Sequence, residues 1–139
     1  MARQESPPVM ACAVVEQTRD GMREVLIGRI PNQPYKGQWT FPGGPVERGE
    51  APEAALRRAL ECLLGLKVEV RFGQPPFDLP WDDVMMRWRF YFCEGRAEDI
   101  RNTHFSEVRW VQLGSLREYE FDPVAQQVVD WLLEQRETR

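Results

Sequence analysis

Short apolar runs alternate with polar stretches along this chain, and most of the runs have the length of a β-strand. Val9 to Glu16 is almost entirely apolar and predicts a buried strand. Asp20-Gly21 is a hairpin signal, so Arg23 to Ile30 is predicted to be the returning strand. Val84 to Cys93 predicts a longer strand with a two-residue period. One face of this strand carries Met86, Trp88, Phe90 and Phe92, and the other carries Arg87, Arg89 and Tyr91.

Three shorter strands complete the predicted sheet, at Gln38 to Phe41, Lys67 to Phe72 and Glu107 to Val111. Two proline-containing segments between the strands, Pro31 to Gly37 and Pro75 to Pro80, are predicted to be loops.

Two amphipathic segments predict helices. Pro52 to Leu64 is rich in alanine and leucine, begins with a proline suited to the first helical position, and is followed by a glycine cap, Gly65. Asp122-Pro123 opens a second helix, with Asp122 as its N-cap. Strands and helices in this order predict an α/β fold, in which a mixed sheet carries a helix on each face as an α/β/α sandwich.

Length and composition fit one domain. Of the 139 residues 42% are hydrophobic, and we expect a flexible tail at residues 1–8 before a single domain at residues 9–139. The net charge of -4 disfavours nucleic acid as the main partner. The longest N-terminal apolar run is too short for a membrane span or a signal core. Three scattered cysteines and one histidine predict neither a disulfide framework nor a zinc site, so a cytoplasmic location is expected.

One segment combines several groups that suit a phosphate-bearing ligand. From Gly37 the chain reads GQWTFPGGPVERGE up to Glu50, and the first predicted helix follows. The adjacent Gly43 and Gly44 allow backbone N–H groups to approach a ligand closely, and a helix N-terminus favours phosphate. Glu47 and Glu50 offer carboxylate oxygens to a hard cation.

This segment resembles the signature of the Nudix hydrolase superfamily, GX5EX7REUXEEXGU, in which U is aliphatic. The fixed positions that match are Gly44, Glu50, Arg58, Leu60, Gly65 and Leu66. The lead-in GQWTFPGG and the late strand around Trp110 also look like the family's, and the resemblance covers roughly Val9 to Leu133 in element order. It implies a Nudix-type sandwich, a nucleoside diphosphate-linked substrate, and Mg²⁺ or Mn²⁺ in an active member. It also implies catalytic roles for Glu50 and Glu107 and metal binding by Glu47 and Glu50.

The chain departs from the signature where the family places the glutamates that hold divalent metals. Ala59, Cys62 and Leu63 occupy those three positions. At about 100° per residue they form an apolar stripe with Leu56, whereas Glu61 faces away and is no substitute. Loss of metal ligands costs orders of magnitude in activity. The sequence therefore predicts a degenerate signature with the fold retained and metal-dependent hydrolysis weak or lost.

For several candidate residues, a structural role is the alternative to a role in catalysis or binding. Glu50 and Arg58 are expected to brace the loop against the helix as an ion pair, ahead of any metal or ligand role. Cys62 is expected to be a small buried hydrophobe. Arg87 and Arg89 are candidate phosphate ligands or part of a solvated strand face.

Trp39 and Glu107 also have two interpretations each. Trp39 is a candidate platform for a nucleobase or a core residue, and Glu107 is a catalytic carboxylate or an exposed loop residue. A homodimer stays open, because Val124, Val128 and Trp131 suit either a core or a dimer seam.

Two functions compete at this stage. One is a Nudix protein that binds a nucleotide-type ligand with little or no hydrolysis and needs no metal ion. The other is an active, divergent Nudix hydrolase that cleaves a nucleoside diphosphate linked to another moiety, with Mg²⁺ held by Glu47, Glu50 and Glu107. The replaced glutamates favour the binding protein, and a small-molecule nucleotide derivative is the expected partner in both.

Overall fold

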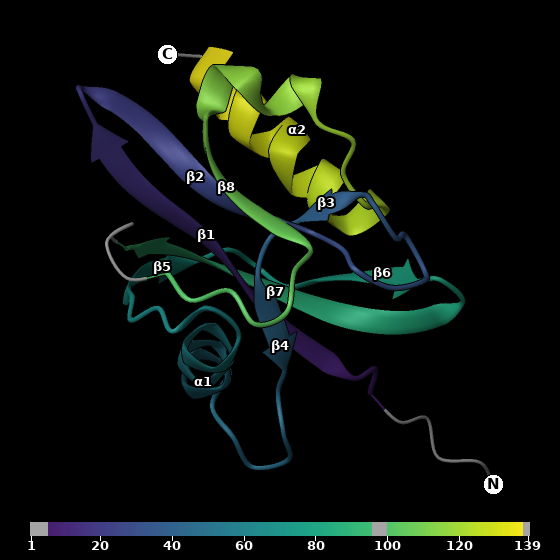
Figure 1. Ribbon diagram of the computed structural model, residues 1–139. Coiled ribbons are helices and arrows are strands. Elements are labelled where there is room, and N and C mark those ends of the chain that lie inside the picture. Colours follow the sequence, from purple (N-terminus) through teal and green to yellow (C-terminus); the bar gives the residue numbers. More distant parts are fainter. Residues whose placement is uncertain (1–5, 96–99, 138–139) are drawn as a thin grey trace, which may run out of the picture.

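A computed structural model of the chain describes residues 6–95 and 100–137. Its elements are, in chain order, β1 (Val9–Arg19), β2 (Met22–Arg29), β3 (Trp39–Thr40), β4 (Gly43–Pro45), α1 (Pro52–Leu64), β5 (Glu69–Gly73), β6 (Phe77–Trp81), β7 (Val84–Glu94), β8 (Glu107–Gln112), the 3-10 helix η2 (Leu113–Glu118) and α2 (Pro123–Glu137). Figure 1 shows a twisted sheet with α1 on one side and α2 on the other. The predicted α/β/α sandwich is thereby confirmed.

The central strand β1 makes the sheet mixed. It pairs antiparallel with β2 and with β4, and it pairs parallel with β7. The strand order is β3-β2-β1-β7-β5, with β6 paired to β7 and β8 paired to β2. The predicted N-terminal tail lies in part outside the described residues, at 1–5. Its last residue, Pro8, already lies beside β7, because its carbonyl accepts a 2.8 Å hydrogen bond from the N–H of Arg87.

Two hydrophobic cores lie on the two faces of this sheet. Val14 of β1 and Phe92 of β7 pack beneath α2, whereas Val15 and Tyr91 pack against α1. Because β1 is covered on both faces, its sequence is a continuous apolar run and does not alternate with polar residues. The first core also buries Val124 and Val128 of α2, with Trp131 packed at its margin. A core and a dimer seam were the two predicted locations of these three residues, and the structure shows them at the core.

The predicted helix at residues 52–64 is confirmed, together with both of its end signals. Pro52 occupies the first turn, and Gly65 ends the helix in the left-handed region with φ 62°. The N–H of Gly65 donates to the carbonyl of Glu61. The N–H groups of Arg101 and Thr103 donate to the carbonyls of Leu64 and Leu63, so the loop before β8 satisfies the carbonyls that a helix end leaves open.

The proline-rich segment predicted as a loop contains the strand β6, which corrects that prediction. Phe77, Leu79 and Trp81 alternate along it and pack at the margin of the α2-side core. β6 pairs with β7 alone among the described strands, and Pro80 faces Met85 in that ladder. Proline is tolerated in an edge strand because its missing N–H donor is not needed on the open side. Helix η2, at residues 113–118, is a second element that the sequence pattern did not predict.

Asp122 is the N-cap of α2, as predicted. Its side chain is fully buried, and Oδ1 accepts 2.9 Å hydrogen bonds from the N–H groups of Val124 and Ala125. Burial raises the pKa of the Asp122 carboxyl, and this outweighs the hydrogen bonds that lower it. The same residue therefore stabilises the helix end and carries a desolvation cost whenever it is ionised.

We expect Asp122→Asn to keep the cap and Asp122→Ala to lose it, at a cost of about 1 kcal/mol. Because the pKa of Asp122 is raised in the folded state, wild-type stability falls as the pH rises from the unfolded pKa through the folded pKa. The asparagine variant lacks this loss. Its free energy of unfolding relative to wild type should therefore increase from about pH 3 to about pH 7 in urea titrations. A difference that does not change with pH contradicts this expectation.

Candidate functional site

The loop before α1 is tied to the helix by an ion pair between Glu50 and Arg58. Arg58 Nε and Nη2 donate to the two carboxylate oxygens of Glu50 at 3.0 and 2.9 Å, and Nη2 also donates to the carbonyl of Pro45 at 3.1 Å. Glu50 Oε1 further accepts the N–H of Glu47 at 3.0 Å. These contacts span both ends of the loop, so the expected brace is present.

The ion pair also fixes the protonation of both partners. The hydrogen bond from Arg58 holds the pKa of the Glu50 carboxyl below its ordinary value, and Glu50 in turn raises the pKa of Arg58. Glu50 is therefore an ionised carboxylate with both oxygens already engaged by a cation. A metal ion at Glu50 would have to compete with this arginine.

The donor set near the loop does not fit the carboxylate-rich metal centre that the resemblance implies. The side chain of Glu47 is 72% exposed, and its Oε1 lies 4.0 Å from Arg58 Nη2. On α1, Ala59 is buried and Leu63 is half-buried, and neither offers a ligand atom. Among residues 6–95 and 100–137, no three His, Cys, Asp or Glu side chains are grouped so that they could hold a metal ion.

Cys62 is exposed, which corrects its predicted burial. Two helical steps of about 100° place Cys62 on nearly the opposite side of α1 from Leu60, which is fully buried. The apolar character of cysteine is therefore not enough to place Cys62 in the core. Cys62 lies on the flank of α1 that also carries Arg58, one turn away. The other two cysteines, Cys12 and Cys93, are buried, and all three are free thiols.

The two glycines of the segment serve packing in this structure. Gly43 and Gly44, whose backbone N–H groups were expected to approach a ligand, lie in β4 and pair with Cys12 and Ala11 of β1. A Cβ on Gly43 would lie 2.3 Å from the carbonyl oxygen of Ala11, and a Cβ on Gly44 would lie 2.9 Å from the Cβ of Ala59. Gly43 thus permits the close strand pairing, and Gly44 permits the close approach of α1.

The two candidate arginines of β7 differ in their surroundings. Arg87 donates from Nε and Nη2 to both carboxylate oxygens of Asp78 on β6, at 2.9 and 3.1 Å. Arg89 lies with its guanidinium 5.9 Å from the ring centre of Tyr91, and its buried Nε has no hydrogen-bond partner among the described atoms. Arg89 is therefore the arginine of this strand that is left with an unused donor.

Trp39 and Glu107 lie on the face of the sheet that α2 covers. Each faces Arg29 in the strand ladder, and directly opposed residues point to the same side. Trp39 is buried in the α2-side core, and Glu107 forms an ion pair with Arg109. The structure consequently does not gather Glu107 with Glu47 and Glu50, whose loop leads into the helix on the opposite face.

A cluster around Trp39 was not found by sequence reasoning. The guanidinium of Arg109 lies 5.5 Å from the ring centre of Trp39 and 5.9 Å from that of Tyr119, whose hydroxyl it also contacts. These two residues cover Trp39, so it is closed to a stacking ligand in this conformation. The alternation of Glu107, Arg109 and Val111 along β8 was the available signal, but Tyr119 comes from η2, which was not predicted.

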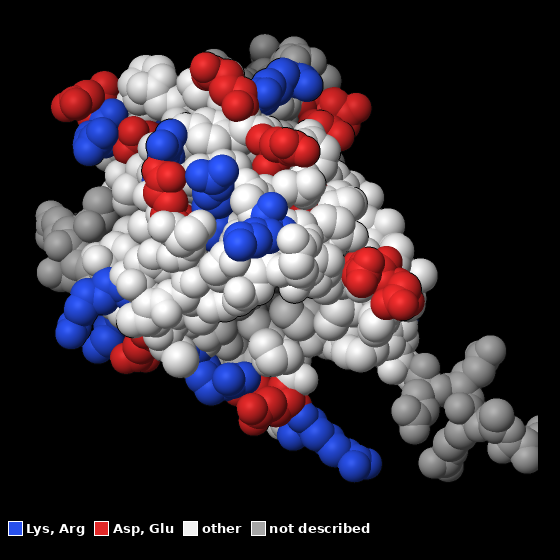
Figure 2. All heavy atoms as spheres, turned by 45° about the vertical axis from the view of Figure 1, so that its right-hand side comes forward, with Lys and Arg blue, Asp and Glu red and all other residues white. Residues whose placement is uncertain are grey.

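Charged side chains of both signs are mixed on the surface shown in Figure 2. This agrees with the acidic balance of the chain, 22 Asp and Glu against 18 Lys and Arg. In the part of the chain that the structure describes, no helix has the length and apolar character to cross a membrane.

The brace makes a direct prediction. Arg58→Gln should lower the melting temperature at low salt and have less effect at high salt, because the ion pair is solvent-exposed and screened. Since the pKa of Glu50 is lowered in the folded state, the stabilisation by the Glu50–Arg58 ion pair is present above the unfolded pKa. It is lost as the pH falls through the folded pKa. Arg57→Gln, the same change at the exposed neighbouring position, is the control in thermal unfolding. Equal effects of the two substitutions would argue against the brace.

Comparison with known proteins identifies relatives in sequence and in structure. Residues 7–132 match the model of the NUDIX domain. A nucleoside triphosphatase NudI of Enterobacter sp. (strain 638) is 29% identical over 94 residues, covering 59% of this chain and 67% of the relative. An 8-oxo-dGTP diphosphatase of Haemophilus influenzae is 27% identical over 108 residues, covering 78% of this chain and 79% of the relative.

Solved structures share the fold at low sequence identity. The Nudix hydrolase RenU of M. smegmatis has a TM-score of 0.80 at 20% identity, covering 99% of this chain and 90% of its own. The NUDIX domain of Shewanella oneidensis NrtR, solved with ADP ribose, has a TM-score of 0.76 at 17% identity, covering 96% and 90%.

Proposed function

Since this chain belongs to the NUDIX domain family, we propose that it binds a nucleoside diphosphate-linked ligand and that its metal-dependent hydrolysis of such a ligand is weak or lost. The observation that carries this proposal is the α1 face, where Ala59, Cys62 and Leu63 offer no carboxylate and Glu50 is bound by Arg58. Two carboxylates in one loop, one of them paired, supply too little negative charge to offset the desolvation of two divalent ions.

The ligand class is supported by the names of similar proteins. One relative is named for nucleoside triphosphates and another for 8-oxo-dGTP, and one structure of the same fold was solved with ADP ribose. A nucleotide carries phosphate, and Arg89 is the candidate ligand whose buried Nε has no hydrogen-bond partner in the described part of the molecule. We therefore place the ligand's phosphate near Arg89 and assign Arg87 and Trp39 structural roles. The cytoplasmic location and the homodimer stay predictions.

An active hydrolase is the second candidate, and the names of the two relatives favour it because both describe enzymes that cleave a nucleoside triphosphate. In that case the exposed Glu47 would hold one Mg²⁺ or Mn²⁺ together with the phosphates of the substrate, which is a common way for Mg²⁺ to bind. Glu107, held by Arg109 on the other face of the sheet, would take no part in this site.

The test combines turnover with binding. Phosphate release is measured for nucleoside triphosphates, dinucleotides and nucleotide sugars, with Mg²⁺ and with Mn²⁺, and thermal stabilisation by the same compounds is measured with and without metal. We expect at least one compound to raise the melting temperature without metal and none to be cleaved at an enzymatic rate. Clear metal-dependent turnover by the native chain would show that the second candidate is right. If no compound is cleaved or stabilises the fold, the proposed ligand class is wrong.

A further inference from the structure

The loop between β2 and β3 leaves the sheet and returns to it over a closed base. The N–H of Ile30 donates to the carbonyl of Gln38 at 2.8 Å, and the N–H of Gly37 donates to the carbonyl of Ile30 at 2.9 Å. Arg29 Nε adds a 3.0 Å hydrogen bond to the carbonyl of Gly37. Residues 31–36, between these bonds, form a strap, and in Figure 1 this strap passes beside β6.

One residue fastens the strap to the hairpin of β6 and β7. The ring of Tyr35 meets that of Trp81 edge to face, with centroids 4.9 Å apart and planes 75° apart. The hydroxyl of Tyr35 also accepts a 3.2 Å hydrogen bond from the N–H of Asp82, in the turn of the hairpin. Among the described residues, no other hydrogen bond or ring contact joins the strap to this hairpin. Tyr35 is therefore the latch of the strap.

The closed strap holds Tyr35 in an unfavourable backbone conformation. Its φ is 68°, in the left-handed region, where a bulky residue is an outlier. Such a conformation persists only where the surrounding contacts enforce it. Here these are the two contacts of the latch and a 3.0 Å hydrogen bond from the N–H of Gln38 to the carbonyl of Tyr35. Release of the latch allows Tyr35 to relax, and this relaxation favours the open strap.

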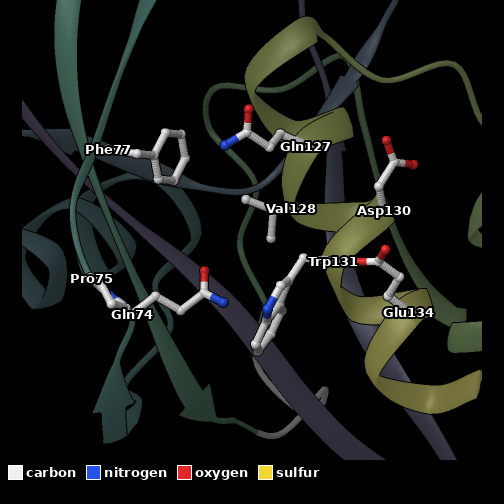
Figure 3. A pocket seen from close by; sticks show the side chains of 8 residues that line it. All are labelled: Gln74, Pro75, Phe77, Gln127, Val128, Asp130, Trp131 and Glu134. Carbon is white, nitrogen blue, oxygen red and sulfur yellow. The ribbon is translucent and has the colours of Figure 1, made fainter. Parts of the chain in front are cut away.

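The strap covers one end of the apolar face of β6. Figure 3 shows the first residue of this face, Phe77, across a groove from Trp131 of α2. The last residue, Trp81, is half-buried and packs on Trp88 of β7 with ring centroids 5.6 Å apart. Trp88 is itself buried in the α2-side core. Because Trp88 supports Trp81 from the core, an opening of the strap exposes an indole that is already held in place.

We propose that residues 31–36 are a mobile strap that opens over Trp81 while the sheet stays folded, with Tyr35 as the latch that holds it closed. Opening breaks both contacts of the latch and the hydrogen bond between Gln38 and Tyr35, and Tyr35 leaves the left-handed region. The base bonds of Ile30 stay formed, and the indole of Trp81 becomes accessible to solutes. The strap contains none of the candidate residues of the loop before α1, so this inference does not depend on the proposed ligand or on hydrolysis.

Native-state hydrogen exchange on the full-length chain tests this opening one amide at a time. The N–H groups of Gln38 and Asp82 report on the strap, and the N–H of Ile30 reports on its base. We expect Gln38 and Asp82 to be protected but to exchange at rates that low concentrations of urea do not change, because a local opening exposes little surface. Ile30 should exchange more slowly, with the urea dependence of global unfolding.

Tyr35→Phe weakens the latch and leaves the rest of the strap intact. It keeps the ring and removes the hydroxyl that accepts the N–H of Asp82. The N–H of Gln38 binds the Tyr35 carbonyl and not the hydroxyl, yet its exchange should become about fivefold faster, because the closed state loses one hydrogen bond. Tyr119→Phe removes the hydroxyl of another half-buried tyrosine and is the matched control, so exchange at Gln38 should stay at the wild-type rate.

A second measurement follows the indole of Trp81 in the chain labelled with fluorotryptophan. Tyr35→Asn removes the ring of the latch and introduces a residue that tolerates the left-handed region. Broadening of the Trp81 fluorine signal by a dissolved nitroxide should increase severalfold in this variant, whereas broadening of the Trp88 signal should not. Circular dichroism and melting temperature verify that each variant is folded.

Three results would overturn the proposal. Exchange at Gln38 and Asp82 occurs only through global unfolding, or Tyr35→Phe leaves exchange at Gln38 unchanged, or the nitroxide broadens Trp81 equally in the native chain and in Tyr35→Asn. The first result would show that the strap is part of the global folding unit. The second would show that Tyr35 is no latch, and the third that the strap does not control access to Trp81.

Discussion

Replacing Ala59, Cys62 and Leu63 by glutamate is expected to create a divalent metal site on α1. The three positions are spaced three and four residues apart along the helix, so they lie on one side of it. Three carboxylates there would converge on the flank next to the loop that Glu50 and Arg58 hold. Carboxylate oxygens are the ligands that Mg²⁺ and Mn²⁺ prefer, and water completes their coordination. We expect Mn²⁺ affinity, measured by electron paramagnetic resonance, to rise at least about tenfold over the native chain.

The three substitutions differ in what they cost the fold. Cys62 is exposed, so Cys62→Glu should be nearly neutral for stability. Ala59 lies against Gly44, and Leu63 packs at the margin of the α1-side core, so a glutamate at either position gives up apolar contacts. Melting temperatures of the single and triple variants therefore accompany each titration, to establish that the metal is added to a folded protein.

A control separates a built site from added charge. Ala54→Glu adds a carboxylate to an exposed position of the same helix and should leave Mn²⁺ affinity unchanged relative to the native chain. If the native chain binds Mn²⁺ as tightly as the folded triple variant, another ligand set exists and weak hydrolysis can no longer be argued from α1. Phosphate release by the triple variant but not by the native chain would show that the remainder of the site is intact.

The regular elements could be predicted because their signals are local. A proline at the start, a glycine at the end and an alanine- and leucine-rich interior fixed α1 to residues 52–64, as the structure has it. The two-residue period of β7 separated the residues of the two cores correctly, since alternate strand residues must point to opposite faces. The brace between Glu50 and Arg58 also followed from the sequence, through the resemblance.

What could not be predicted depends on the neighbours that the fold supplies. Pro80 suggested a loop, but β6 is an edge strand in which proline costs no hydrogen bond. The sequence left Trp39 as a platform for a nucleobase or, more often, a core residue, and the cover formed by Arg109 and Tyr119 is visible only in the fold. Glu107 belonged to a candidate site only by its position in the chain, and the register of β8 against β2 turns it to the other face.

Gly43→Ala is expected to destabilise the fold by about 3 kcal/mol, at the upper end of ordinary overpacking. The added Cβ would lie 2.3 Å from the carbonyl oxygen of Ala11 and 2.7 Å from the Cα of Cys12. Both atoms belong to the backbone of β1, which is held on its other edge by the long parallel ladder with β7. The clash therefore cannot be relieved by a side-chain rotation, and β4 must move away from β1.

Gly44→Ala is the matched comparison, because its Cβ would meet the Cβ of Ala59 at 2.9 Å and not a strand backbone. A small shift of α1 can relieve that contact, so we expect a smaller loss of stability in urea titrations. Adding Ala59→Gly to Gly44→Ala removes the contact, although glycine in a helix costs up to about 1 kcal/mol by itself. The double variant should therefore lose less free energy of unfolding than the two single variants lose in total. If Gly43→Ala costs no more than Gly44→Ala, β4 is free to yield, and the loop that carries Glu47 and Glu50 is held by the Arg58 brace and not by the strand.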